Sequence, residues 1–314
     1  MDDLGDRIEL ALGSAFTSLR ERSGPPRLGA AMRYSVFPGG ARLRPKLTMQ
    51  VARALGDPEP RVTDAAATAV ELIHCASLVH DDLPCFDDAA ARRGQPTVHV
   101  AFDEPTAVLV GDALIVMAFQ VLAKSKPSRP ERLADLTLTL CKGVGHPGGI
   151  IAGQAWESEP GVALFSYHRA KTAALFEAAC ALGAIAAGGD PAAWAVVGEL
   201  LGRAYQIADD IADATLTAET LGKNVGVDSA KQRPSAFDRL GEQGCRDLLD
   251  RLLHDAAAAV PECPGREPLR RWLRDVSLGV LRLRYPQLAR AAESSRQAAA
   301  PPEEAAALWA AAAE

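Results

Sequence analysis

Two stretches of this chain, residues 107–123 and 173–189, are apolar on every side of a helix, and they restrict its fold more than any other feature. A helix of that kind is either buried in the core of a large protein or crosses a membrane. The first stretch is shorter than the about 20 residues that span a bilayer, and it contains Asp112. The second contains Glu177 and ends in Gly188-Gly189. Both therefore predict buried helices, and we expect no membrane span.

The rest of the sequence also favours helices. Aromatic residues make up only 5% of a chain that is 48% hydrophobic and rich in Ala and Leu, and no stretch alternates as a strand does. With 314 residues and no low-complexity linker, the sequence predicts a single all-α domain over 1–314, with a helical or frayed tail at 298–314. The expected helices are 2–22, 29–37, 44–55, 61–82, 104–123, 131–142, 150–157, 167–187 and 191–214, then a loop at 215–233 and further helices to about 285.

Charge and cysteine content argue against several partner classes. The formal net charge of −6 argues against a nucleic-acid partner, since such proteins usually present a basic face. The six cysteines include no Cys-x-x-Cys pair, which is typical of reduced thiols and not of a disulfide framework or a zinc site. The N-terminus is acidic, where a secretory leader is basic. We therefore expect a cytoplasmic protein.

Two aspartate-rich segments follow long apolar runs. The first reads HDDLPCFDD at 80–88, and the second reads QIADDIAD at 206–213. In the second, Asp209 and Asp213 lie one helical turn apart and share a face with Gln206. In the first, Pro84 supplies the break in the helix that is needed to align Asp87 with Asp81.

Such carboxylates are most often solvated surface charges. Here the apolar runs before both segments argue against that interpretation, and like charges at helical spacing destabilise a helix unless a cation compensates. Magnesium fits best, because it takes hard oxygen ligands and is usually held by one or two carboxylates together with substrate phosphates. No His/Cys spacing fits zinc.

Basic residues near turns or beside these segments provide candidate phosphate ligands. Each one alone is most simply a solvated charge, and their joint placement is what favours the phosphate role. The chain has neither a P-loop nor a Gly-x-Gly-x-x-Gly motif, so a nucleotide-binding sheet enzyme is not supported. The candidates are Arg42, Arg44, Arg92, Arg93, Lys171, Lys223 and Arg233.

In order and in type, these motifs resemble those of the trans-isoprenyl diphosphate synthases, most closely the bacterial geranylgeranyl diphosphate synthases. The resemblance covers about residues 39–235 and implies an all-α, isoprenoid-synthase-type helical bundle around a central cavity, as well as a homodimer. Besides the aspartate segments, the matching segments are GGARLRP at 39–45, RRGQPT at 92–97, GDAL at 111–114, GQ at 153–154, KT at 171–172 and LGK at 221–223.

The resemblance also implies roles for individual residues. It implies three magnesium ions whose main ligands are Asp81, Asp87 and Asp209, with Asp82, Asp210 and Asp213 in supporting or further ligand roles. For the allylic diphosphate it implies Arg92, Lys171 and Lys223, with Thr172 and Gln206 alongside. For isopentenyl diphosphate it implies Arg44, His74 and Arg93. We include Arg233 among the substrate-binding candidates because of its charge.

The activity implied is condensation of isopentenyl diphosphate with an allylic diphosphate, which extends farnesyl to geranylgeranyl diphosphate (C20). In this family a bulky aromatic at the position of Ala76 shortens the product, so Ala76 and Ser77 are the chain-length candidates. Both are small here, and with the two-residue insertion Pro84-Cys85 they follow the pattern of bacterial C20 synthases. By the same resemblance we expect a role in carotenoid or bacteriochlorophyll supply. The alternatives are a farnesyl diphosphate (C15) synthase, a class I terpene cyclase and a non-catalytic modulatory subunit. A cyclase lacks the second aspartate motif, and modulatory subunits lose the aspartates, whereas both motifs are present here.

Two positions depart from the family pattern. Ala41 stands where the family usually has Lys, which removes one expected contact to isopentenyl diphosphate; Arg42 and Arg44 are the candidates to replace it. Glu157 stands where Asp is commoner after Gly153-Gln154. Beside the first aspartates, we interpret His80 as a hydrogen-bonding support and Cys85 as a small filler, neither as a catalytic group.

Overall fold

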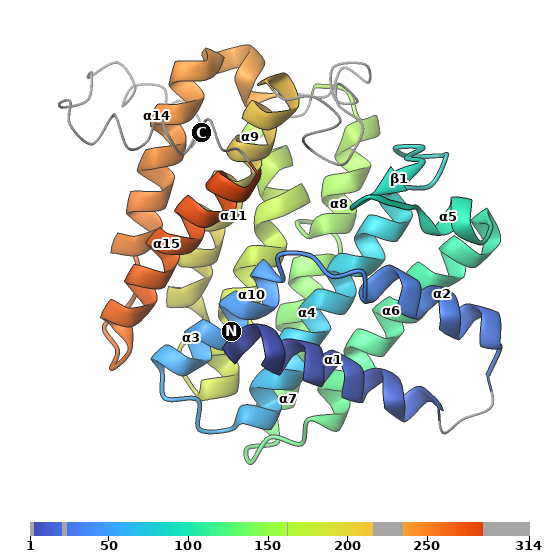
Figure 1. The fold of residues 1–314 in the computed structure, drawn as a ribbon. Helices are drawn as coiled ribbons and strands as arrows, with labels where there is room; N and C mark the ends of the chain where they lie inside the picture. The colour runs from blue at the N-terminus through green and yellow to red at the C-terminus, as the bar shows by residue number, and fades with distance from the viewer. Residues whose placement is uncertain (1–2, 21–23, 162, 216–234, 285–314) are drawn as a thin grey trace.

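The computed structural model describes residues 3–20, 24–161, 163–215 and 235–284, and it is almost entirely helical (Figure 1). This confirms the predicted all-α class. The tail expected at 298–314 lies outside the described residues. The α-helices are α1 Asp3–Arg20, α2 Pro26–Val36, α3 Leu43–Ala54, α4 Pro60–Asp81, α5 Val98–Ala101, α6 Glu104–Lys124, α7 Glu131–Val144, α8 Ile150–Ala155, α9 Leu164–His168, α10 Ala174–Ala187, α11 Pro191–Thr215, α14 Ala236–Ala258 and α15 Arg266–Arg284.

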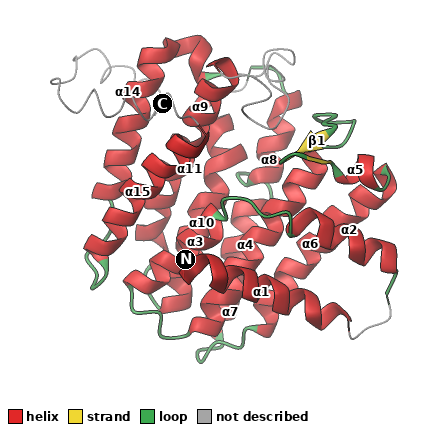
Figure 2. Ribbon diagram, in the orientation of Figure 1, coloured by secondary structure: helices red, strands yellow, loops and turns green. Residues whose placement is uncertain are grey.

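Short elements interrupt the helices at two places where the sequence predicted continuous helix, at the end of 150–157 and inside 167–187. A 3₁₀-helix, η1 (Trp156–Ser158), follows α8, and a π-helix, η2 (Arg169–Ala173), separates α9 from α10. The expectation that no strand forms is wrong in one detail, because β1 (Ala91–Arg92) and β2 (Gln95–Pro96) pair antiparallel (Figure 2). Arg93 and Gly94 connect them with φ of 54° and 75°, the backbone of a tight two-residue hairpin turn.

Helix α10 is the central element and packs against α3, α4, α7 and α11. Almost all of its residues are buried, which confirms the buried helix predicted at 173–189. Small residues allow the close packing: a Cβ on Gly183 would lie only 2.3 Å from the Thr48 carbonyl oxygen on α3. The Thr48 hydroxyl donates to the Ala179 carbonyl at 3.0 Å, which satisfies this polar side chain inside the core.

Buried side chains form two clusters, and α11 contributes to both: its first half to the larger and its second half to the smaller. The larger combines residues of α1 to α4, α6, α7 and α10. The smaller joins α9, α11 and α14, through residues such as Leu164, Ile207 and Leu248. Helix α11, which carries the second aspartate segment, packs against α10 and α14.

Among the described residues, three helical stretches are long and apolar enough to cross a membrane by length and composition alone. In Pro60–Asp81 and Leu164–Ala187 the apolar window is 78% and 83% buried inside the protein. In Glu104–Lys124 it is only 39% buried, so the prediction of a buried helix at 107–123 is wrong for one face, which leaves Leu109 and Val116 exposed. All six cysteines are among the described residues, and each is a free thiol, as their spacing predicted.

Candidate active site

The first aspartate segment starts at the end of α4. The helix ends at Asp81, and the chain turns back so that the Asp87 backbone N–H donates to the Asp81 carbonyl oxygen at 2.8 Å. Burial raises the pKa of the Asp81 carboxyl; the charge of Lys171 opposes this rise and that of Asp87 adds to it. Two carboxylates held this close favour a bound cation, because a cation keeps both ionised.

Asp82 points in a different direction. Adjacent helical residues project about 100° apart, and the Asp82 side chain is buried while Asp81 is half-buried. Arg92 Nε donates to both Asp82 carboxylate oxygens, at 2.8 and 2.9 Å, and Arg92 Nη2 lies 2.6 Å from Oδ1. Burial raises the pKa of Asp82, and Arg92 opposes that rise. In this structure Asp82 therefore orients Arg92 on the hairpin.

The second aspartate segment lies on α11. Asp209 and Asp213, one turn apart, are both half-buried, while Asp210 is buried. Gln206 on the same helix accepts a hydrogen bond from the Thr172 hydroxyl at 2.6 Å and donates to Asp210 at 2.9 Å. The bond between Thr172 and Gln206 connects α11, which carries the second aspartate segment, to the π-helix η2.

The π-helix η2 carries Lys171 and Thr172, and it packs against both α8 and α11. Glycines make these approaches possible: a Cβ on Gly153 would lie 2.3 Å from the Lys171 Cα, and one on Gly202 would lie 2.4 Å from the Ala173 Cα. π-Helical turns occur frequently at functional sites. The matching Gly153-Gln154 motif thus has a steric role in placing η2.

Lys171 forms an ion pair with the buried carboxylate of Glu157. Glu157 also accepts hydrogen bonds from the Tyr167 hydroxyl at 2.9 Å and from Gln154 Nε2 at 3.1 Å. Since the charge of Lys171 also acts on Asp81, Glu157 holds this lysine close to the first aspartate segment. Glu157 fulfils this contact although the family more often has Asp at its position.

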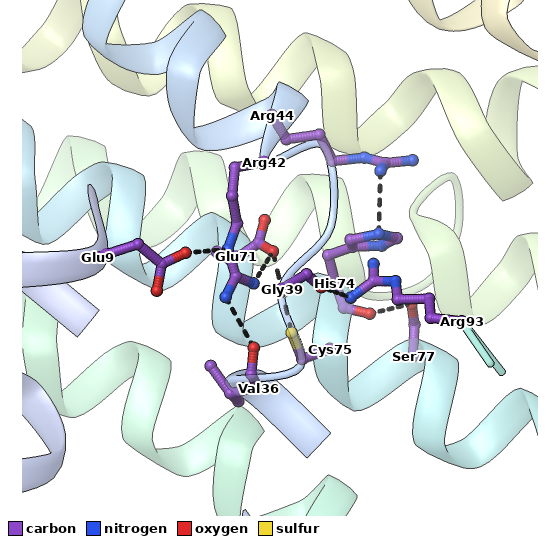
Figure 3. Close-up of polar contacts among 10 residues, drawn as sticks. All are labelled: Glu9, Val36, Gly39, Arg42, Arg44, Glu71, His74, Cys75, Ser77 and Arg93. Atoms are coloured by element: carbon purple, nitrogen blue, oxygen red, sulfur yellow. Dashed lines mark hydrogen bonds and ion pairs between the residues drawn. The ribbon is translucent and has the colours of Figure 1, made fainter. Parts of the chain in front are cut away.

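A second basic group gathers around His74, which lies on α4 about two turns before Asp81 (Figure 3). Arg44 Nη1 lies 3.3 Å from His74 Nε2, and the Arg44 guanidinium stands 4.5 Å from the ring centre of Phe176. Arg93, at the hairpin turn, donates to the Gly39 carbonyl oxygen. The structure thus places together Arg44, His74 and Arg93, the three residues expected to bind one substrate.

Arg42 does not replace the lysine missing at position 41. Its guanidinium is buried and turned away from Arg44, toward α1 and α4 (Figure 3). Arg42 Nη1 lies 2.6 Å from the equally buried Glu71, Nε donates to Glu9 at 2.8 Å, and Nη2 donates to the Val36 carbonyl at 2.7 Å. Arg42 therefore anchors the loop before α3, and Arg44 alone remains near the expected site.

Lys223 and Arg233 lie outside the described residues. His80 contacts α6, where its Nε2 lies 3.2 Å from the Val108 carbonyl oxygen and fills the space that a Cβ on Gly111 would need. Sequence reasoning missed Glu71, Tyr167 and His168. Their positions in apolar or aromatic stretches carried no chemical signal, apart from the closeness of Tyr167 and His168 to Lys171 in sequence.

The residues present fit magnesium. Within the part of the chain that the structure describes, no three His, Cys, Asp or Glu side chains converge as a ready-made metal site. The two segments instead offer half-buried carboxylate pairs, Asp81/Asp87 and Asp209/Asp213. Magnesium is commonly held by one or two carboxylates, with phosphate oxygens and waters completing its octahedron. Two carboxylate pairs without a complete set of protein ligands are what we expect for magnesium ions that bind together with a diphosphate.

The fold and these motifs have clear counterparts among known proteins. The profile of the family described as polyprenyl synthetase matches residues 25–245. Geranylgeranyl diphosphate synthases of Cereibacter sphaeroides and Rhodobacter capsulatus are each 51% identical to this chain over 85% of it, covering 93% and 92% of their own lengths. A solved structure, geranyltransferase from Helicobacter pylori complexed with magnesium and isoprenyl diphosphate, is 30% identical with a TM-score of 0.72, covering 90% of this chain and 98% of that one. As its motifs predicted, the chain belongs to the polyprenyl synthetase family.

Proposed function

We propose that this protein is a magnesium-dependent prenyltransferase that condenses isopentenyl diphosphate with farnesyl diphosphate to form geranylgeranyl diphosphate. The observation that carries the proposal is the placement of Lys171 and Thr172 on one π-helix: the Thr172 hydroxyl bonds Gln206 beside the second aspartate segment, and the charge of Lys171 lowers the pKa of Asp81 in the first. The synthases at 51% identity support the C20 product.

In this proposal Asp81, Asp87 and Asp209 hold three magnesium ions, with Asp213 as a further ligand. Bound magnesium supplies positive charge that neutralises the departing diphosphate. Lys171, which Glu157 holds beside Asp81, adds a fixed positive charge to the same oxygens.

The condensation follows from this charge arrangement. The allylic C–O bond breaks, its electron pair leaves with the diphosphate, and a delocalised allylic cation remains. The double bond of isopentenyl diphosphate, bound by Arg44, His74 and Arg93, forms the new C–C bond, and the released diphosphate takes up the proton that is lost. An apolar cavity favours this step, because water would capture the cation.

The proposal is tested by incubating the purified protein with magnesium, labelled isopentenyl diphosphate and, in turn, dimethylallyl, geranyl and farnesyl diphosphate. We expect a C20 product from farnesyl diphosphate, identified by chromatography after dephosphorylation. Accumulation of C15 would identify a farnesyl diphosphate synthase, and a hydrocarbon formed without isopentenyl diphosphate would identify a cyclase. No elongation with any primer would contradict the proposal and favour a modulatory subunit.

The structure separates the two residues proposed to set chain length. Ser77 lies about 40° around α4 from Asp81 and about 6 Å below it, whereas Ala76 lies about 140° away. Ser77 is half-buried, and so is His74 on the same face; Ala76 is fully buried. Ser77 is therefore the better placed of the two to meet a prenyl tail that extends downward from Asp81.

We predict that Ser77→Phe shifts the main product from C20 toward C15, because the ring blocks the tail. Ala76→Tyr instead places a ring in a packed interior and should lower Tm, since overpacking costs about 1–3 kcal/mol. Product chromatography and thermal unfolding of both variants check this. If Ala76→Tyr shortens the product and Ser77→Phe does not, then Ala76, and not Ser77, lies on the face of α4 that meets the prenyl tail.

We further propose a homodimer formed through α6. This helix leaves Val108, Leu109 and Val116 exposed at 43%, 54% and 68%, and Leu109 and Val116 share one face two turns apart. Asp112, exposed between Leu109 and Val116, interrupts this apolar face, and exposed large apolar side chains gathered on one helix commonly mark a protein interface.

Leu109→Glu/Val116→Glu is expected to yield a monomer in light scattering coupled to size exclusion, because two charges would be buried at the interface. Leu10→Glu is the matched control, because Leu10 is 73% exposed on α1, away from this face. A dimer that persists in the α6 double variant would exclude α6 as the interface.

A further inference from the structure

Asp210 follows Asp209 directly, yet it occupies a different environment. It is 6% exposed and points into the space between α11 and α14, while Asp209 and Asp213 are half-buried. Its Oδ1 accepts from Gln206 at 2.9 Å, and its Oδ2 accepts from the backbone N–H of Ala236 at 2.7 Å. A carboxylate with both oxygens bound inside the protein is poorly placed to ligate a metal.

His168 approaches the same carboxylate. The imidazole is 1% exposed, and its Nε2 lies 3.5 Å from Asp210 Oδ2. Phe165 and Tyr167 enclose the ring, at 6.5 and 5.7 Å between ring centres. A separation of 3.5 Å is longer than a good hydrogen bond, and such contacts often tighten when a ligand binds.

The contact between His168 and Asp210 links two elements of the proposed site. His168 is the last residue of α9 and directly precedes the π-helix η2 with Lys171 and Thr172. Asp210 lies beside Asp209 on α11. The contact between His168 and Asp210 therefore joins the element with the proposed phosphate-binding lysine to the element with the proposed metal-binding aspartates.

We propose that the buried His168–Asp210 pair is a positioning device, which holds η2 against α11 so that Lys171 and Asp209 bind one diphosphate together. This inference rests on the proposed function and assigns a role to His168, a residue outside the motifs that the sequence analysis singled out. The first segment follows the same division: Asp81 faces the site, while Asp82 is buried against Arg92. In each pair, the second aspartate aligns the site and the first contacts the ligand.

The test uses His168→Phe, which keeps an aromatic ring between Phe165 and Tyr167 but removes the polar contact. We expect its dissociation constant for inorganic pyrophosphate in the presence of magnesium, measured by calorimetry, to rise about tenfold, the lower end of the effect of removing a group that orients metal ligands. KM for the allylic diphosphate should rise similarly, while KM for isopentenyl diphosphate should stay within about twofold, since Arg44 and His74 lie elsewhere.

Further variants keep the inference falsifiable. His168→Gln retains an N–H donor and should recover most of the affinity, whereas Phe165→Leu is the matched packing control and should leave it unchanged. A loss of Tm without a change in pyrophosphate affinity for His168→Phe would reduce His168 to a structural role and overturn the inference. If the wild-type protein binds pyrophosphate but elongates no primer, the proposed function fails, while the binding series still decides the role of His168.

Discussion

Asp81→Asn is expected to lower kcat for chain elongation by at least about 100-fold. The amide is neutral, so the first carboxylate pair would lose the charge that, in the proposed function, holds magnesium against the leaving diphosphate. A bound metal stabilises the charge of the transition state by several kcal/mol. Because a barrier increase of about 1.4 kcal/mol slows a reaction tenfold, losing about 3 kcal/mol of this stabilisation lowers kcat about 100-fold. Steady-state kinetics at saturating magnesium, with pyrophosphate binding measured in parallel, check the prediction.

Asp88→Asn is the matched control for this variant. It removes one negative charge from the same segment, but the Asp88 side chain is exposed, and its left-handed backbone (φ 49°) suits Asn as well as Asp. Activity should stay within about twofold, because an exposed charge is largely screened. Equal losses in the two variants would mean that the charge of the whole segment matters and that Asp81 has no special position.

Arg42→Met is expected to destabilise the protein by about 3–5 kcal/mol, the usual cost of leaving one partner of a buried ion pair without its counter-charge. The Arg42 and Glu71 side chains are only 3% and 2% exposed, and Nη1 lies 2.6 Å from the carboxylate. Arg42 also adopts a left-handed backbone (φ 49°), which these contacts must hold in place. In thermal unfolding, we expect Tm to fall by roughly 5–8 °C, because 1 kcal/mol corresponds to about 1.5 °C in a chain of this length.

Two further variants separate the buried pair from charge effects in general. Arg246→Met removes an arginine whose partner, Glu242, is half exposed on the same helix, so the change should be about 0.5 kcal/mol or less. Arg42→Met/Glu71→Leu removes both buried charges and should recover part of the lost stability. Recovery should be incomplete, because the Val36 carbonyl also loses its donor. A double variant as unstable as Arg42→Met would contradict this account of the pair.

Most helix boundaries could be predicted because apolar periodicity and Gly/Pro breaks are local properties. The break after Asp81 and the shared face of Asp209 and Asp213 belong to this class. Helix α2 begins at Pro26, earlier than the expected residue 29, because proline suits the first turn of a helix.

The hairpin at 91–96 and the π-helix at 169–173 could not be predicted in this way. Arg93 keeps a left-handed backbone because it contacts Gly39, and Gly153 leaves the room that η2 occupies beside α8. The hairpin and the π-helix both depend on contacts with segments that are far away in the sequence, and a local sequence pattern contains no information on such contacts.

The sequence by itself determined the chemistry: which carboxylates, arginines and lysines the chain possesses, and that their spacing suits magnesium and a diphosphate. Only the tertiary structure decided which member of each adjacent aspartate pair faces the site. Neighbouring residues on a helix project about 100° apart, and a buried carboxylate needs a partner. Those partners, Arg92 for Asp82 and His168 with the Ala236 amide for Asp210, come from other elements that only folding brings together.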